Sequence, residues 1–181
     1  MINQDKFIVV RALNYAFEKH KNQKRRGSKL NYMVHPVTIM ELVRQYKGDS
    51  KNLIPLQIAA ILHDVVEDTN GTIEEIEAMF GHLVASLVWG LTSNQTLINE
   101  MGKNEYMKMK LLEFTQYEFT LKCLDRLGNI LDGPHLQYVL DTIELVNYLK
   151  ENREEITSTQ QVILDDLLEA CVAEKQLLEE S

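Results

Sequence analysis

The chain has 181 residues, 45% of them hydrophobic and 25% charged, which is the composition of an ordinary soluble globular domain. Its net charge of −8 argues against a general nucleic-acid binder, and its longest apolar runs fall short of the roughly 18 residues that a membrane span needs. The two cysteines, Cys123 and Cys171, lack CxxC spacing, and the first residues lack the layout of a signal peptide, so we expect a cytoplasmic protein.

Helical periodicity dominates the chain, and no stretch shows the alternation of a strand ladder. We therefore predict an all-α helical bundle with loops at 21–33 and 92–104. The apolar run 83–91, which includes Trp89, is expected to form a core helix. The other predicted helices span residues 4–20, 36–46, 55–68, 104–113, 115–130, 135–150 and 158–179, with a short helix after Thr72.

Charge is unevenly distributed along the sequence. Six of the 19 basic residues fall within positions 19–29, whereas the segment from 151 onward carries nine acidic residues against two basic ones. An anionic ligand is therefore expected at the first segment and not at the second. A loop whose charges are simply solvated is the alternative for the basic segment.

The segment HDVVED (63–68) places one histidine and three carboxylates directly after the apolar run IAAIL (58–62). Residues four positions apart lie within about 40° of each other on a helix, so the four polar side chains would share one face. Imidazole and carboxylate groups together suit Mn²⁺, Fe or Zn²⁺. A solvated helix end is the alternative, but the preceding apolar run makes full solvation difficult.

Two residues elsewhere in the sequence are candidates for the remaining ligands. His35 stands at the start of a predicted helix, and Asp125 lies in the leucine-flanked segment LKCLDRLGNI (121–130). A buried aspartate needs a partner, which a metal ion would supply. A structural histidine, and an aspartate paired with Arg126 or Lys122, stay open as alternatives.

In their order, these segments resemble the HD-type metal phosphohydrolases. The likeness is greatest to the hydrolase domain of Rel/Spo-type alarmone enzymes and to the stand-alone small alarmone hydrolases, and it covers about residues 5–150. Asn31 departs from the family pattern, which has proline at that position. The matching segments are QKRRGS (23–28), YMVHP (32–36), AAILHDVVEDT (59–69), TIEEI (72–76), FGHLVASLVWGLT (80–92) and KCLDRLGN (122–129).

The resemblance implies that residues 1–181 form a single HD-type hydrolase domain with a C-terminal helical extension at 151–181. It implies removal of the 3′-pyrophosphate from guanosine tetra- or pentaphosphate, giving GDP or GTP, with one Mn²⁺ ion as cofactor and Fe, Co or Zn as alternatives. The implied metal ligands are His35, His63, Asp64 and Asp125, the implied water-activating pair is Glu67 and Asp68, and the implied substrate contacts are Arg25 or Arg26, Lys122 and Asn129.

Two other functions remain open at this point. One is an HD-type nucleotidase or phosphodiesterase that acts on another nucleotide, and the other is a non-catalytic nucleotide-binding helical module. The acidic final helix has enough apolar positions to pack on the domain or on a second subunit, so a homodimer is also open.

Overall fold

The computed structural model describes residues 7–25, 27 and 29–180. The described residues form helices, together with one isolated bridge between Lys24 and Asn31. The all-α prediction is thus confirmed. Among these residues, no helix combines the length and apolar character that crossing a membrane requires.

The chain divides into two compact units, Met1–Thr92 and Ser93–Ser181. The single domain expected over 1–181 stays a prediction, and each unit is described separately below.

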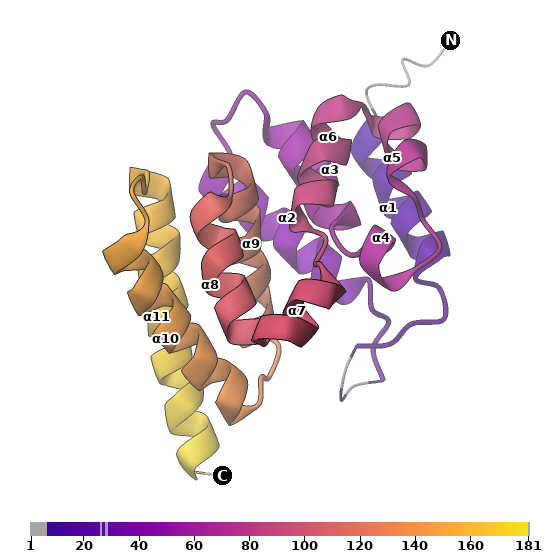
Figure 1. Cartoon of the computed structure of the whole chain (residues 1–181). Coiled ribbons are helices and arrows are strands. Elements are labelled where there is room, and N and C mark those ends of the chain that lie inside the picture. The colour runs from indigo at the N-terminus through magenta and orange to yellow at the C-terminus, as the bar shows by residue number, and fades with distance from the viewer. Residues whose placement is uncertain (1–6, 26, 28, 181) are drawn as a thin grey trace. The chain divides into compact units, whose positions relative to one another are not determined.

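The first unit is built around α3 (Leu53–Leu62), in which every residue from 56 to 62 is buried. A helix that is buried on all sides needs neighbours on all sides. They are α1 (Ile8–Lys19), α2 (Val34–Lys47) and α6 (His82–Leu91), each of which contacts α3 (Figure 1).

Two short helices complete this unit, and both lie on the segment that follows α3. The first is α4 (Val65–Asp68), and the second is α5 (Ile73–Phe80), which packs on α6. Gly71, between them, leaves no room for a side chain, because a Cβ there would lie 2.4 Å from Cγ1 of Val65. The chain therefore turns tightly against α4 before α5 begins.

The predicted continuous helix over 55–68 is wrong in one respect. The helix breaks at His63 and Asp64, since α3 ends at Leu62 and α4 begins at Val65. The His63 ring accounts for part of the break, because its Nδ1 lies 2.8 Å from the carbonyl oxygen of Ala60 in the last turn of α3. The two residues thus occupy a helical corner and not the middle of a regular helix.

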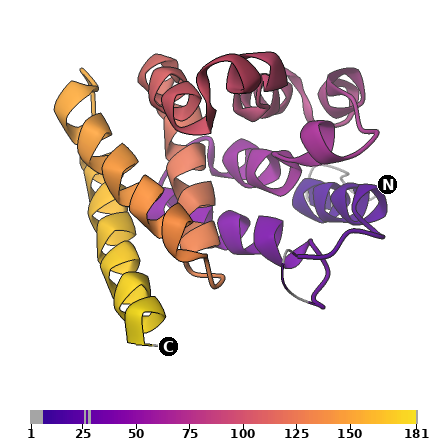
Figure 2. The same ribbon diagram turned by 60° about the horizontal axis from the view of Figure 1, so that its bottom comes forward.

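The second unit contains five helices among its described residues. Gln160, in α11, donates from Nε2 to the Gln116 carbonyl (2.8 Å) and lies 3.1 Å from the Thr120 hydroxyl, which ties α11 to α9. Figures 1 and 2 both show α10 and α11 side by side. The helices are α7 (Gln95–Met101), α8 (Lys103–Glu113), α9 (Gln116–Ile130), α10 (Leu136–Asn152) and α11 (Ser158–Glu180).

Two further expectations are wrong. The predicted loop 92–104 contains α7, which begins where the Asn94 side chain accepts hydrogen bonds from two backbone N–H groups and ends at Gly102, whose φ is +86°. Trp89 is 66% exposed and does not enter the core. The buried positions of α6, such as Val84, Val88 and Leu91, follow helical spacing, and Trp89 falls outside that face.

The two cysteines should be almost unreactive in the folded protein. Both are buried, and burial raises the pKa of the Cys123 thiol to about 12 and that of Cys171 to about 11. Because the thiolate is the reactive form, we expect labelling by a disulfide reagent at pH 8 to be at least ~100-fold slower than for a free cysteine. Two thiols should appear on denaturation, whereas rapid labelling of either one in the native protein would contradict the structure.

Candidate metal centre and acidic pair

Three of the predicted ligands come together in the first unit. Suitable ligand atoms of His35, His63 and Asp64 all lie within 4.8 Å of one another. His35 comes from the first turn of α2, whereas His63 and Asp64 form the corner between α3 and α4. Both histidines are buried and Asp64 is half-buried, so the cluster is formed by side chains that the fold withdraws from water.

The orientation of His63 is set by its own helix. Its Nδ1 faces the Ala60 carbonyl at 2.8 Å, and its Nε2 faces Oδ2 of Asp64 at 3.0 Å. A metal-binding histidine commonly donates its other ring N–H to a backbone carbonyl in this way, which fixes both the tautomer and the ring plane. The break in the helix therefore aims Nε2 toward the cluster.

The donor set fits a divalent cation. Two imidazoles, with ring centroids 5.4 Å apart, and one carboxylate make a mixed nitrogen/oxygen site. Such a set suits Mn, Fe, Co or Zn better than an ion that prefers thiolates or an all-oxygen shell. Tyr32 adds a further contact, because its hydroxyl donates a hydrogen bond to Oδ2 of Asp64.

The acidic pair predicted to activate water, Glu67 and Asp68, lies in α4, directly after the corner. Both side chains are exposed, and the Asp68 carboxylate accepts a hydrogen bond from Nε2 of Gln23 at 3.1 Å. Partial desolvation of the Asp68 carboxyl raises its pKa, and the nearby charges of Asp64 and Glu67 add to the rise, while the bond from Gln23 opposes it. A carboxylate with a raised pKa is a better proton acceptor in neutral solution.

Asp125, the fourth predicted ligand, belongs to the second unit. It is buried in α9, where Lys122 forms an ion pair with its Oδ2 (2.8 Å) and Asn129 donates to its Oδ1 (2.9 Å). Two residues predicted to contact substrate thus hold Asp125 in this structure. Their contact with substrate, like metal binding by Asp125, stays a prediction.

The basic segment is described only in part. Arg25 is half-buried, and its backbone N–H bonds to the Leu30 carbonyl at 3.0 Å. Arg26, the other predicted nucleotide contact, lies outside the described residues.

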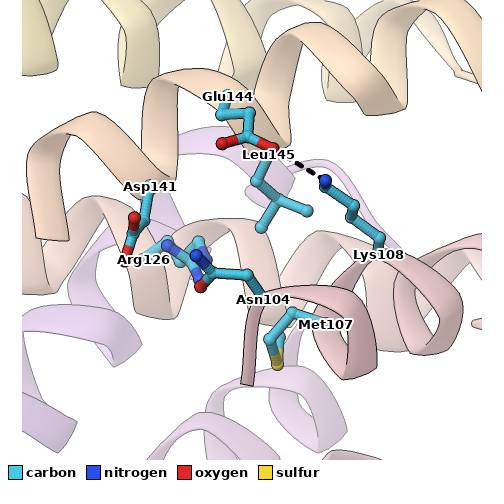
Figure 3. Close-up of a pocket in the computed structure, with 7 residues that line it drawn as sticks. All are labelled: Asn104, Met107, Lys108, Arg126, Asp141, Glu144 and Leu145. Carbon is cyan, nitrogen blue, oxygen red and sulfur yellow. Dashed lines mark hydrogen bonds and ion pairs between the residues drawn. The ribbon is translucent and has the colours of Figure 1, made fainter. Parts of the chain in front are cut away.

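A separate small pocket lies within the second unit, between α8, α9 and α10 (Figure 3). Its space of about 10 Å³ is room for no more than one water molecule. Among its lining residues, Lys108 forms an ion pair with Glu144 at 2.7 Å, and Nη1 of Arg126 donates to the Thr142 hydroxyl at 2.6 Å. This pocket is too small for a nucleotide.

Sequence reasoning missed two residues next to the acidic pair and the cluster. His20 follows the last residue of α1 and is buried, although no sequence motif carries it. In the sequence, Gln23 is marked only by its place in the segment QKRRGS (23–28). Their contacts with Asp68 and Tyr32 join parts of the chain that only the fold brings together.

The amino-acid sequence is similar to a known protein family and to several named proteins. Residues 12–111 match the family model described as HD domain, a match that runs across the boundary between the two units. The chain is 35% identical over 132 residues to the Xenopus tropicalis protein named guanosine-3′,5′-bis(diphosphate) 3′-pyrophosphohydrolase MESH1, covering 72% of each chain. The Danio rerio protein of the same name is 32% identical over 69% of this chain and 68% of its own length.

A longer protein and a solved structure are also similar. A Synechocystis protein named probable guanosine-3′,5′-bis(diphosphate) 3′-pyrophosphohydrolase is 35% identical over 68% of this chain, which corresponds to 16% of that protein. The structure titled "A metazoan ortholog of SpoT hydrolyzes ppGpp and plays a role in starvation responses" superposes with a TM-score of 0.74 at 23% identity. It covers 90% of this chain and 94% of that one. At that identity, the likeness shows the fold.

Proposed function

Because the chain belongs to the HD domain family, and within it to the family of the MESH1 pyrophosphohydrolases, we propose that it is a metal-dependent 3′-pyrophosphohydrolase of guanosine tetra- and pentaphosphate. The products are GDP or GTP and pyrophosphate. The observation that carries the proposal is the cluster of two buried histidines, His35 and His63, with the half-buried Asp64, which lies inside the segment matched by the family.

In this proposal, His35, His63 and Asp64 would hold one Mn²⁺ ion, and Asp125 would supply the fourth ligand. Asp125 is included as a ligand because it lies in the motif KCLDRLGN (122–129), which resembles the family pattern. When bound, a divalent ion lowers the pKa of a coordinated water and polarises a phosphate oxygen.

The chain's own residues supply the remaining chemistry. Glu67 and Asp68 orient the attacking water and accept its proton, since both carboxylates follow the metal-binding corner within one turn. The basic side chains of Arg25 or Arg26 and of Lys122 offset the negative charge of the substrate, and Asn129 contacts it through its amide.

The proposed function predicts release of pyrophosphate from guanosine tetraphosphate by the purified protein with Mn²⁺. A chelator should abolish the activity, and added Mn²⁺ should restore it, because the ion is needed to form the nucleophile. The measurement is a coupled assay for pyrophosphate, with product identity checked by chromatography.

A substrate panel separates this function from its alternatives. An HD-type nucleotidase or phosphodiesterase would release phosphate or open a diester in another nucleotide and leave guanosine tetraphosphate intact. A non-catalytic module would bind guanosine tetraphosphate without turnover even in the presence of Mn²⁺. Either result would replace the proposed function.

A further inference from the structure

His20 is a buried histidine that the ligand set does not use. It follows the last residue of α1 and is 1% exposed. Its ring lies against that of Tyr32, with centroids 4.6 Å apart and planes inclined by 35°. Its Nδ1 is 2.6 Å from Oε1 of Gln23. A polar ring at this depth needs its hydrogen bonds met by particular neighbours.

Two hydrogen bonds link His20 to Asp68 through Gln23, and the donor and acceptor of each can be assigned. The Gln23 amide donates from Nε2 to Oδ2 of Asp68 at 3.1 Å, so its oxygen is the atom that accepts from His20. The proton of the neutral ring is therefore on Nδ1. The other ring nitrogen, Nε2, is buried and has no hydrogen-bond partner in the part of the chain that the structure describes, and a bare nitrogen is better tolerated there than an N–H.

A second line of contact leads from the same ring to the metal cluster. Tyr32, which lies against His20, donates its hydroxyl hydrogen to Oδ2 of Asp64. That oxygen is also the one that faces Nε2 of His63 at 3.0 Å. His20 is thus linked through Tyr32 to a proposed metal ligand, Asp64. It is linked through Gln23 to a proposed water-activating carboxylate, that of Asp68.

Backbone bonds fix the residues that make these contacts. The Gln23 N–H donates to the His20 carbonyl at 2.9 Å, and the Tyr32 N–H donates to the Gln23 carbonyl at 3.1 Å. Together with the adjacent bridge between Lys24 and Asn31, these two bonds hold the beginning of the basic segment next to the residues that follow it. Gln23 therefore has a fixed backbone from which its amide reaches Asp68.

We propose that His20 and Gln23 are positioning residues for hydrolysis: the His20 N–H orients the Gln23 amide so that its NH₂ group holds one Asp68 oxygen, leaving the other for the attacking water. The His20 ring also supports Tyr32 on Asp64. This inference rests on the proposed function. Because Gln23 acts through Asp68, its loss should lower kcat much more than it changes KM.

The tautomer of His20 tests the arrangement without any assay of activity. Long-range ¹H–¹⁵N spectra of the metal-free protein should show His20 protonated at Nδ1, with its signals assigned by their absence in His20→Phe. Gln23→Leu should shift the His20 Nδ1 resonance, and the exposed-site control Gln45→Leu should not. A ring protonated at Nε2, or one unaffected by Gln23→Leu, would overturn the proposed relay.

Kinetics of the Mn²⁺-loaded protein test the positioning role itself. Gln23→Leu should lower kcat about 10- to 100-fold, as the loss of outer-shell partners commonly does, with KM changed less than about 3-fold and bound metal unchanged. Gln45→Leu should match the wild type, and similar melting temperatures would exclude a general loss of structure.

A double-mutant cycle identifies the residue through which Gln23 acts. In an Asp68→Asn background, Gln23→Leu should cause little further loss, because the group that it positions is already altered. Multiplicative effects of the two changes would overturn the inference. A wild-type protein that releases no pyrophosphate would refute the proposed function instead, and the His20 spectra would still decide whether the relay exists.

Discussion

Replacing His63 with alanine is expected to lower pyrophosphate release at least about 10³-fold, because the metal ion supplies several kcal/mol of stabilisation that no other group replaces. The Ala60 carbonyl faces Nδ1 of His63 and so orients the ring. This leaves Nε2, which lies 3.0 Å from Oδ2 of Asp64, as the proposed ligand atom. Loss of the ring removes one ligand and the support of another. Bound Mn²⁺, measured by equilibrium dialysis and elemental analysis, should fall together with the rate.

The matched control is His82→Ala in the same unit, since the His82 side chain is 84% exposed and bonds to the exposed residues Glu77 and Ser86. It should retain metal and activity. Asp125→Asn belongs in the same experiment: a loss of bound Mn²⁺ comparable with that of His63→Ala would support Asp125 as the fourth ligand. A His63→Ala protein that keeps both metal and turnover would remove the cluster from the mechanism.

The helices that sequence predicts best are those with long amphipathic repeats. The predicted helix 158–179 is α11 (Ser158–Glu180), and the predicted helix 115–130 is α9, which begins after a capping box formed by Thr115 and Glu118. By contrast, α7 has seven residues and none of them is buried, so it carries no periodic signal. Only the capping side chain of Asn94 marks its start.

The same distinction applies to the candidate site. His35, His63 and Asp64 were found because short motifs carry them, and the structure brings these three together. The sequence does not predict the helical corner at His63, because the apolar residues on both sides of it suit a continuous helix. The bond between Gln23 and Asp68 spans 45 positions of sequence and depends on how the basic segment returns to α2, which no local pattern specifies.

Replacing Glu67 with glutamine should separate catalysis from metal binding. Glutamine has the same shape as glutamate but cannot accept a proton from water, so we expect kcat to fall about 10²- to 10⁴-fold. Glu67 is exposed in α4, and substitutions at such positions usually change the free energy of unfolding by less than about 0.5 kcal/mol. Metal content and melting temperature should therefore equal those of the wild type.

A matched change elsewhere makes this result specific. Glu77→Gln alters another exposed glutamate of the same unit and should leave kcat unchanged. Comparison with Asp68→Asn then shows which member of the acidic pair accepts the proton. If it is Glu67, Glu67→Gln should lower kcat more than Asp68→Asn does. The reverse order would assign proton transfer to Asp68. If Glu67→Gln lost its metal, Glu67 would be a ligand; if it turned over normally with metal bound, proton transfer would have to be assigned to another group.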